Sequence, residues 1–512
     1  MDSSEGTPHT SRRHPIPNQA NKHGLAGLSD AKGAPRAVAG AAISGVRAVA
    51  SYLKNHGRPR RNSSDSSREP SPFTREVWAW GMWDWASAAF NAIVTTFVFS
   101  VYITDKDLFG GSANQRLGYA FAIAGVLIAV GAPAIGQAID RSGKRATFLR
   151  VTTLLTALIT ACLFFVSPGE NHLWLGLFLL AAGNIACETG SVVYNAIITD
   201  ITEPKHLGRV SGFGWGLGYV GGIVLMLILF IGFISPEVGW FGVTSHNAMH
   251  VRVSMLAAAI WTLVFSAPLL GSLRDEPAVH DGGGLGIIAS YKELGSSVKR
   301  LWVSERHILW FLLSSAIYRD GLAGVFSFGA VLAGTAFGFE KQEIMIFGIA
   351  ANLVAGVATI LFGWVDDKIG ARAVIVVSLS AMVSFGVIIF LCHDGMAGLS
   401  GHAIYWIFGL LLCVFVGPTQ SASRTYLARI APSGAEGEIF GLYATTGRAV
   451  SFLAPFMYST AITVGATASG IALDEAAYYG IIGLAIVLAV GLLAFLPVSA
   501  HHIPRTQAAT SA

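Results

Sequence analysis

The chain has 512 residues, of which 53% are hydrophobic and only 12% are Asp, Glu, Lys or Arg, with a formal net charge of +4. Soluble proteins carry about 25% charged residues, so there are too few charges here to cover a water-soluble globule. The four cysteines lie in apolar runs without CxxC spacing, which excludes zinc fingers and disulfide frameworks. The composition predicts an all-α polytopic membrane protein.

The first 76 residues are polar and rich in Ser, Pro, Gly and basic residues. A segment of this composition cannot bury enough apolar surface to fold alone, so we expect residues 1–76 to be a disordered cytoplasmic tail. Within it, the helix-prone stretch 37–53 is interrupted by Arg47. Because a spanning helix needs about 20 apolar residues, we expect this stretch to be at most a helix lying on the membrane surface.

From Val77 to Pro497, long apolar runs alternate with short polar breaks. Twelve runs are long enough to cross a bilayer core about 30 Å thick. The predicted spans are 78–102, 117–139, 147–166, 173–198, 211–235, 252–273, 308–334, 344–366, 373–392, 403–424, 439–464 and 476–497. We divide the chain into an N-terminal six-helix half (77–273), a cytoplasmic linker (274–306), a C-terminal six-helix half (307–497) and a cytoplasmic C-terminal tail (498–512).

The loops carry their basic residues unevenly, and Lys and Arg are enriched on the cytoplasmic side of membrane proteins. If the N-terminus is inside, the outer loops carry little more than Lys106, Arg116 and Lys341. We therefore expect both termini to be cytoplasmic. The Ala- and Gly-rich spans and short loops favour a bacterial cytoplasmic membrane.

An internal repeat relates the first six spans to the last six. GQAIDRSGKR follows span two and GWVDDKIGAR follows span eight, with Gly136 and Gly363 227 positions apart. HLGRVSG and AEGEIFG recur 229 positions apart after spans four and ten, and Asp84 and Asp320 hold similar positions in spans one and seven. The repeat predicts two halves that are parallel copies about an axis along the membrane normal.

The decapeptide after span two resembles the signature of the major facilitator superfamily. The resemblance implies twelve helices in two pseudo-symmetric halves, and loop charges that control the equilibrium between conformers. The matching residues are Gly136, Asp140, Arg141, Gly143, Lys144 and Arg145, and in the second copy Gly363, Asp367, Lys368, Gly370 and Arg372. Because Ala371 replaces the first base of the closing pair, we expect a weaker charge network in the second copy.

A narrower resemblance extends over most of the membrane body. It is carried by WDWASAAF in span one, GRVSGFGWGLGYVGG in span five, SRTYLARIAP after span ten and EIFGLYATTGRAVSFLAPF in span eleven. These segments resemble the vacuole-effluxer-like branch of the superfamily, named for a yeast vacuolar amino-acid exporter linked to autophagy. The resemblance implies efflux of small solutes such as amino acids.

In this fold, spans one, four, seven and ten line a central cavity, and here they carry unusual polar residues. Our candidates for substrate binding or proton coupling are Asp84, Asn91, Glu188, Asn195, Arg319, Asp320, Gln420, Arg424 and, on span eleven, Arg448. A charge near the bilayer centre costs about 2.5–3.5 kcal/mol and usually faces a cavity or a partner. We expect Glu188 and Asp320 to carry protons or bind a substrate ammonium group. The arginines could bind a substrate carboxylate.

Structural roles remain open for several of these residues. Arg424 could be an anchor at a helix end in the inner leaflet, and Asp84 could lock the two halves together. Arg319 and Asp320 could each pair with another helix, and Arg448 could pair within the protein. We interpret the small-residue run Gly214, Gly218 and Gly222 as close helix packing. We also interpret Trp78 and Trp80 as part of an interfacial aromatic belt.

The chain carries no P-loop, HExxH or GxSxG motif, so we expect no enzymatic activity, cofactor or metal. We predict a secondary active transporter that works by alternating access as a monomer. Its expected partners are a small solute and the lipid bilayer, with protons as the candidate coupling ion and no nucleic acid. The alternatives are a non-transporting membrane sensor or scaffold on the same fold, and a membrane-embedded transferase.

Overall fold

The computed structural model describes residues 71–110, 112–275, 287–473 and 475–498. Most of the predicted N-terminal tail, the stretch 37–53 and residues 499–512 of the C-terminal tail lie outside the described residues. The described residues belong to one compact unit, Asn62–Ala512. Within them, twelve helical spans are long and apolar enough to cross a membrane, as predicted.

The first six spans form one half of the molecule. They comprise α2 (Arg75–Ala89), a π-helical segment (Phe90–Phe97) and α3 (Phe99–Ile103), followed by α5 (Ala113–Ser142), α6 (Arg145–Cys162), α7 (Glu170–Ile201), α8 (Leu207–Leu229) with a π-helical segment (Phe230–Ile234), and α9 (Met249–Ser272). The last six comprise α11 (Arg306–Phe337), α12 (Lys341–Ile369), α13 (Ala371–Leu391), α14 (Gly401–Ile430), α15 (Glu436–Val450) with α16 (Leu453–Ser469), and α17 (Tyr479–Phe495).

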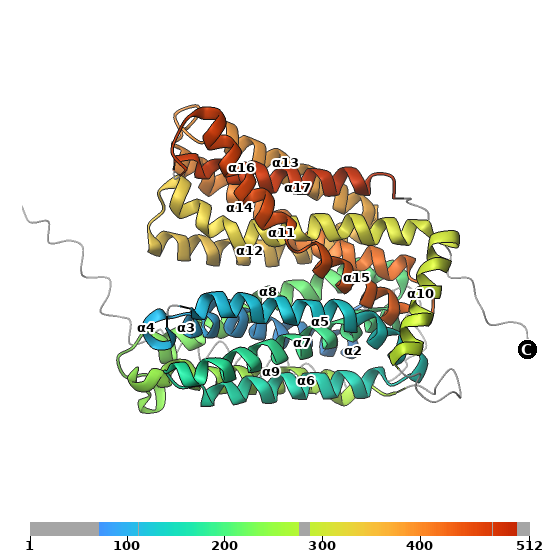
Figure 1. The fold of residues 1–512 in the computed structure, drawn as a ribbon. Helices are drawn as coiled ribbons and strands as arrows, with labels where there is room; N and C mark the ends of the chain where they lie inside the picture. The colour runs from blue at the N-terminus through green and yellow to red at the C-terminus, as the bar shows by residue number, and fades with distance from the viewer. Residues whose placement is uncertain (1–70, 111, 276–286, 474, 499–512) are drawn as a thin grey trace, which may run out of the picture. The chain divides into compact units, whose positions relative to one another are not determined.

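The two halves lie side by side, and the linker marks one end of the helices. In Figure 1, α2–α9 lie on one side, α11–α17 on the other, and α10 (Ile287–Ser304) at one end. We call this the linker end, and the other the opposite end. The predicted linker 274–306 therefore contains a helix that its polar composition did not indicate, and this helix contacts α5 and α11.

Asp275 attaches the start of the linker to α6. Its carboxylate accepts hydrogen bonds from the backbone N–H of Thr147, at 2.9 Å, and from the Thr147 hydroxyl. These bonds favour the charged form and lower the pKa of Asp275. The contact therefore stabilises the fold at pH values above the ordinary carboxyl pKa and is lost as the pH falls below the lowered value.

Like span five, which ends in the π-helical segment Phe230–Ile234, spans one and eleven are not continuous α-helices. Span one changes to π-helix at Phe90, and the hydroxyls of Thr95 and Thr96 donate to the Asn91 carbonyl at 2.8 and 2.9 Å. Span eleven is divided between α15 and α16. Hydropathy detects an apolar run but not a change in its hydrogen-bond register, so the sequence did not predict either irregularity.

Aromatic rings fill the linker-end part of the first half. Trp80 and Trp83 stack on Tyr194, with ring centroids 4.6 and 4.2 Å apart. Trp80 is fully buried and its indole N–H donates to the Tyr194 carbonyl. The prediction that Trp80 belongs to an interfacial belt is therefore wrong, because the ring lies between helices rather than at the lipid headgroups.

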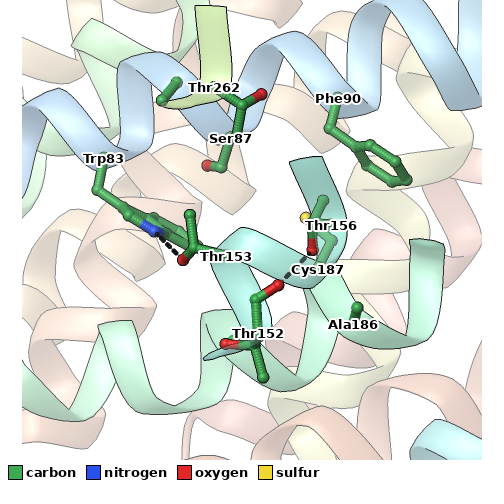
Figure 2. Close-up of a pocket in the computed structure, with 11 residues that line it drawn as sticks. Trp83, Ser87, Phe90, Thr152, Thr153, Thr156, Ala186, Cys187 and Thr262 are labelled. Atoms are coloured by element: carbon green, nitrogen blue, oxygen red, sulfur yellow. Dashed lines mark hydrogen bonds between the residues drawn. The ribbon is translucent and has the colours of Figure 1, made fainter. Parts of the chain in front are cut away.

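A small cavity lies within the first half between α2, α6, α7 and α9 (Figure 2). Trp83 donates to the hydroxyl of Thr153 at 3.0 Å, and the hydroxyl of Thr156 donates back to the Thr152 carbonyl. Ser87 also lines this cavity. Ser87 therefore faces the interior of its own half, whereas Asp84, one turn earlier in α2, contacts Arg424 of the other half.

The glycines of α8 lie on two faces of the helix. Gly214, Gly218 and Gly222 face α2 and the segment after it, as predicted. Gly212 and Gly216 face α12 in the other half, where a Cβ at Gly212 would lie 2.5 Å from the Thr359 carbonyl oxygen. Glycine thus lets the backbone of α8 approach both helices closely.

We predict that Gly214→Ala destabilises the fold and that Gly218→Ala does not. A Cβ at Gly214 would lie 2.6 Å from the Trp80 ring, which stacking holds in place, whereas at Gly218 the nearest atom is 3.5 Å away. Overpacking of this kind costs about 1–3 kcal/mol. Unfolding of both variants in detergent micelles measures the difference, and equal stabilities would contradict this packing.

Candidate functional site

The first charged cluster between the halves joins the end of α5 and the start of α6 to the start of α15. Asp140 accepts hydrogen bonds from the backbone N–H groups of Gly437 and Glu438, at 3.1 and 2.9 Å. Arg145 lies 2.8 Å from Asp140 and 3.0 Å from Glu436. A carboxylate at a helix N-terminus satisfies free N–H groups and complements the helix dipole. We call Asp140, Arg145 and Glu436 the first end lock.

A second cluster repeats this arrangement with the halves exchanged. Asp367, in the last turn of α12, accepts hydrogen bonds from the backbone N–H groups of Gly208 and Arg209 at the start of α8, at 2.8 and 3.3 Å. The Arg209 side chain lies 2.5 Å from Asp367, and Arg429 lies 2.6 Å from Asp366. We call these four charged residues the second end lock. The sequence repeat thus predicted which loop and helix start correspond in the two halves.

The second lock corrects one expectation. We expected it to be weaker because Ala371 replaces a base, but Arg209 and Arg429, from α8 and α14, supply the positive charges. Arg372 does not contribute, because it donates to the carbonyls of Leu496 and Val498 at the end of α17. Motif spacing alone could not identify bases on other helices.

The other signature residues shape the loops. Gly143 and Gly370 have φ values of +64° and +87°, which favour glycine. Gly136 and Gly363 allow close backbone contact across the halves, since a Cβ at Gly363 would lie 2.8 Å from the Gly208 carbonyl oxygen. The remaining bases are exposed or half-buried: Lys144 and Lys368 are exposed and Arg141 is half-buried.

Arg424 lies at the centre of a deeper polar cluster. It donates to the hydroxyl and the carbonyl of Ser211, at 2.9 and 2.6 Å, to Asn195 at 3.2 Å and to Asp84 at 3.3 Å. Its guanidinium also lies 4.7 Å from the centre of the Trp80 ring. These partners belong to the first half, so the cluster joins the two halves.

This geometry decides two of the alternatives. Arg424 is 3% exposed, so the interpretation as a helix-end anchor in the lipid headgroups is wrong. Asp84 contacts Arg424 across the halves, as the locking interpretation expected. The sequence did not single out Ser211, which lies in the glycine run of span five, and no pattern in that run marks it as an arginine partner.

Glu188 and Arg448 form a further ion pair between the halves. Their side chains are 2.7 Å apart, and each is about one third exposed, 32% and 33% respectively. Glu188 lies near the middle of α7, and Arg448 lies in the last turn of α15. Neither side chain is therefore fully enclosed by the protein.

Arg319 and Asp320 point to different partners within their own half. The Arg319 guanidinium lies 3.6 Å from the centre of the Tyr443 ring and donates to the Tyr443 carbonyl at 3.0 Å. Asp320 is buried and accepts a hydrogen bond from the backbone N–H of Ala454 at 2.6 Å. Each residue thus pairs with another helix, which was the structural alternative.

The last two candidates differ in exposure. Asn91 is exposed at the start of the π-helical segment, and Gln420 is half-buried on α14. Neither lies in the clusters around Arg424 and Arg448 described above. Across the described parts of the chain, no group of three or more His, Cys, Asp or Glu side chains is arranged to hold a metal ion.

Comparison with known proteins gives the family. A family model described as vacuole effluxer Atg22 like matches residues 116–508. The MFS-type transporter YxiO of Bacillus subtilis is 25% identical over 430 residues, which cover 83% of this chain and 95% of YxiO. Autophagy-related protein 22-1 of Aspergillus fumigatus is 26% identical over 286 residues, which cover 50% of this chain and 44% of the fungal protein.

Solved structures show the same fold. A bacterial homologue of the iron transporter ferroportin in an outward-facing state superposes with a TM-score of 0.61 at 14% identity, covering 84% of this chain and 100% of that chain. The proton:xylose symporter XylE gives a TM-score of 0.60 at 13% identity, covering 82% and 94%. The chain therefore belongs to the vacuole effluxer Atg22-like family and is a transporter of the major facilitator type.

Proposed function

We propose that this transporter exports a zwitterionic small solute, of the amino-acid class, and that the Glu188–Arg448 pair binds it. The observation that carries the proposal is a carboxylate and a guanidinium 2.7 Å apart, one from each half and each partly exposed in mid-span. An α-amino acid carries the same two charges, with its ammonium group complementary to Glu188 and its carboxylate to Arg448.

A zwitterionic solute is favoured because its two charges can replace Glu188 and Arg448 as each other's partners. A lone anion or cation could satisfy only one member of the pair, and it would leave the other charge unpaired in a low-dielectric site, which is costly. A zwitterion satisfies both at once, and Arg can bind its carboxylate with two parallel hydrogen bonds. The protein pair therefore selects for a solute that carries both charges.

In this proposal the two end locks form the gate that closes the linker end. We propose that the linker end is cytoplasmic, because the basic loops lie there, and that this conformation faces outward. Support comes from the two end locks and the Arg424 cluster, which join the halves toward that end. Removing one partner of a buried ion pair costs about 3–5 kcal/mol, so the locks weigh strongly on the equilibrium between conformers.

Proton coupling through Glu188 completes the proposal. Protonation would neutralise the carboxylate and weaken its attraction to Arg448 across the halves. A proton and a substrate ammonium group would then compete for the same oxygen atoms. We propose that this competition drives efflux as a monomer in a bacterial cytoplasmic membrane.

We predict that binding requires both charges of the solute. Thermal-shift titration of the purified protein with the twenty amino acids identifies binders. Each binder is then compared with its decarboxylated amine and with the acid that lacks the amino group. We expect each analogue to bind at least tenfold more weakly, because one member of the pair is left unmatched. Equal binding of either analogue would contradict the zwitterion site.

Glu188→Gln is expected to fold but to lose proton-driven accumulation of the identified amino acid at least tenfold in proteoliposomes, because the amide cannot take up a proton. Glu203→Gln is the matched control, since Glu203 is 67% exposed in a loop. Unchanged dependence on the pH gradient in Glu188→Gln would show that another group couples the proton.

Asp140→Asn tests the gate. The amide retains one acceptor oxygen for α15 but loses the charge opposite Arg145. We expect several-fold altered turnover with an equilibrium affinity within about twofold of wild type, measured by flux and by binding. Asp107→Asn, at an exposed site outside the locks, should change neither value. A selective loss of affinity in Asp140→Asn would contradict a gating role.

A further inference from the structure

Span eleven is broken shortly after Arg448, and the sequence explains why. α15 ends at Val450, and α16 begins at Leu453. Pro455 lies in the first turn of α16 and has no N–H group with which to bond the Ser451 carbonyl. Proline is tolerated in the first turn of a helix but not in its interior, so the chain starts a new helix here.

Two neighbouring residues of α11 hold the opposite sides of this break. Arg319 holds α15 through the carbonyl and ring of Tyr443, and a Cβ at Gly447 would lie 3.1 Å from the Arg319 guanidinium. Asp320 holds α16 through the N–H of Ala454, at 2.6 Å. In an unbroken helix this N–H would bond to the Val450 carbonyl, so the carboxylate replaces a helical hydrogen bond.

The two segments contact different parts of the protein. α15 packs on α5 of the first half, where the Thr445 hydroxyl donates to the Ala129 carbonyl at 2.8 Å and where Arg448 reaches Glu188 of α7. α16 packs on α17 of its own half, where the Tyr458 ring covers Gly480. Both segments also contact α11 of their own half, but α15 is the one that packs closely on the first half. The break between α15 and α16 therefore lies where the contacts of span eleven change from one half to the other.

In the described part of the first half, the corresponding residues form no such clamp. Asp84, which corresponds to Asp320 in the repeat, contacts Arg424, and α8 continues as α-helix from Leu207 to Leu229. The break in span eleven and the carboxylate of Asp320, which binds α16 after the break, therefore both occur in the second half.

We propose that Arg319 and Asp320 form a hinge clamp. They are positioning residues that set the angle between α15 and α16 and so hold Arg448 against Glu188. This inference rests on the proposed function only in taking the Glu188–Arg448 pair to bind the solute. The hinge itself follows from the contacts of Arg319 and Asp320. It assigns Asp320 to backbone capping instead of proton transfer, and Arg319 to the support of α15 instead of substrate binding.

Backbone capping and proton transfer by Asp320 predict different behaviour of the Asp320→Asn variant. A side-chain amide still presents an oxygen to the Ala454 N–H, so the clamp predicts that Asp320→Asn rescues most of what Asp320→Ala loses. A proton carrier predicts that both variants are equally inactive. Ser327→Ala is the matched control, because it removes an exposed polar group from the same helix.

Hydrogen–deuterium exchange of the full chain in lipid nanodiscs tests the hinge without any substrate. We expect the segment 450–457 to exchange at least tenfold faster in Asp320→Ala, and within about threefold of wild type in Asp320→Asn and Ser327→Ala. Equally fast exchange in Asp320→Asn and Asp320→Ala, or unchanged exchange in Asp320→Ala, would overturn the clamp.

Flux of the amino acid identified by thermal shift then tests the consequence for transport. We expect Asp320→Ala to raise KM at least fivefold, because Arg448 is no longer held in place, and Asp320→Asn to restore it. Loss of transport in Asp320→Asn with normal exchange of 450–457 would overturn the assignment to positioning. Faster exchange in Asp320→Ala, together with absence of amino-acid transport by the wild type, would leave the hinge in place and refute the proposed substrate.

Discussion

A charge inside a bilayer needs a partner, and in this transporter many of the partners lie across the boundary between the two halves. Arg424, Arg448 and Asp140 each complete their contacts with residues of the other six-helix unit. The same interactions that make ionisable residues tolerable in the membrane therefore also hold the halves together. In the proposed mechanism these contacts are exchanged as the halves move, so folding and transport would depend on the same side chains.

Much of this organisation could be predicted from the sequence. Twelve spans, two related halves and the equivalence of Asp140 and Asp367 all follow from hydropathy and from a repeat of about 227 positions. The repeat is informative because each acid binds the start of a helix, and the two helix starts, at Gly208 and Gly437, recur at nearly the same offset as the acids, 229 against 227 positions. A local motif therefore carried information about a contact between distant parts of the chain.

The partners of individual charges could not be predicted in the same way. Arg209 and Arg429 complete the second end lock from helices outside its motif, and Arg424 is buried although it lies near the end of its predicted span. These pairings depend on which helix faces turn toward one another, which hydropathy does not define. The break in span eleven was missed for a different reason, since a single proline in an apolar run leaves hydropathy almost unchanged.

Each end lock binds two successive backbone N–H groups and an arginine with a single aspartate, and the two locks lie on equivalent sides of the repeat axis. A rotation of one half against the other would therefore act on both locks. Together the two aspartates bind four backbone amides at the starts of α8 and α15. The duplication of the chain thus places a carboxylate-bound helix start from each half at the boundary between the halves.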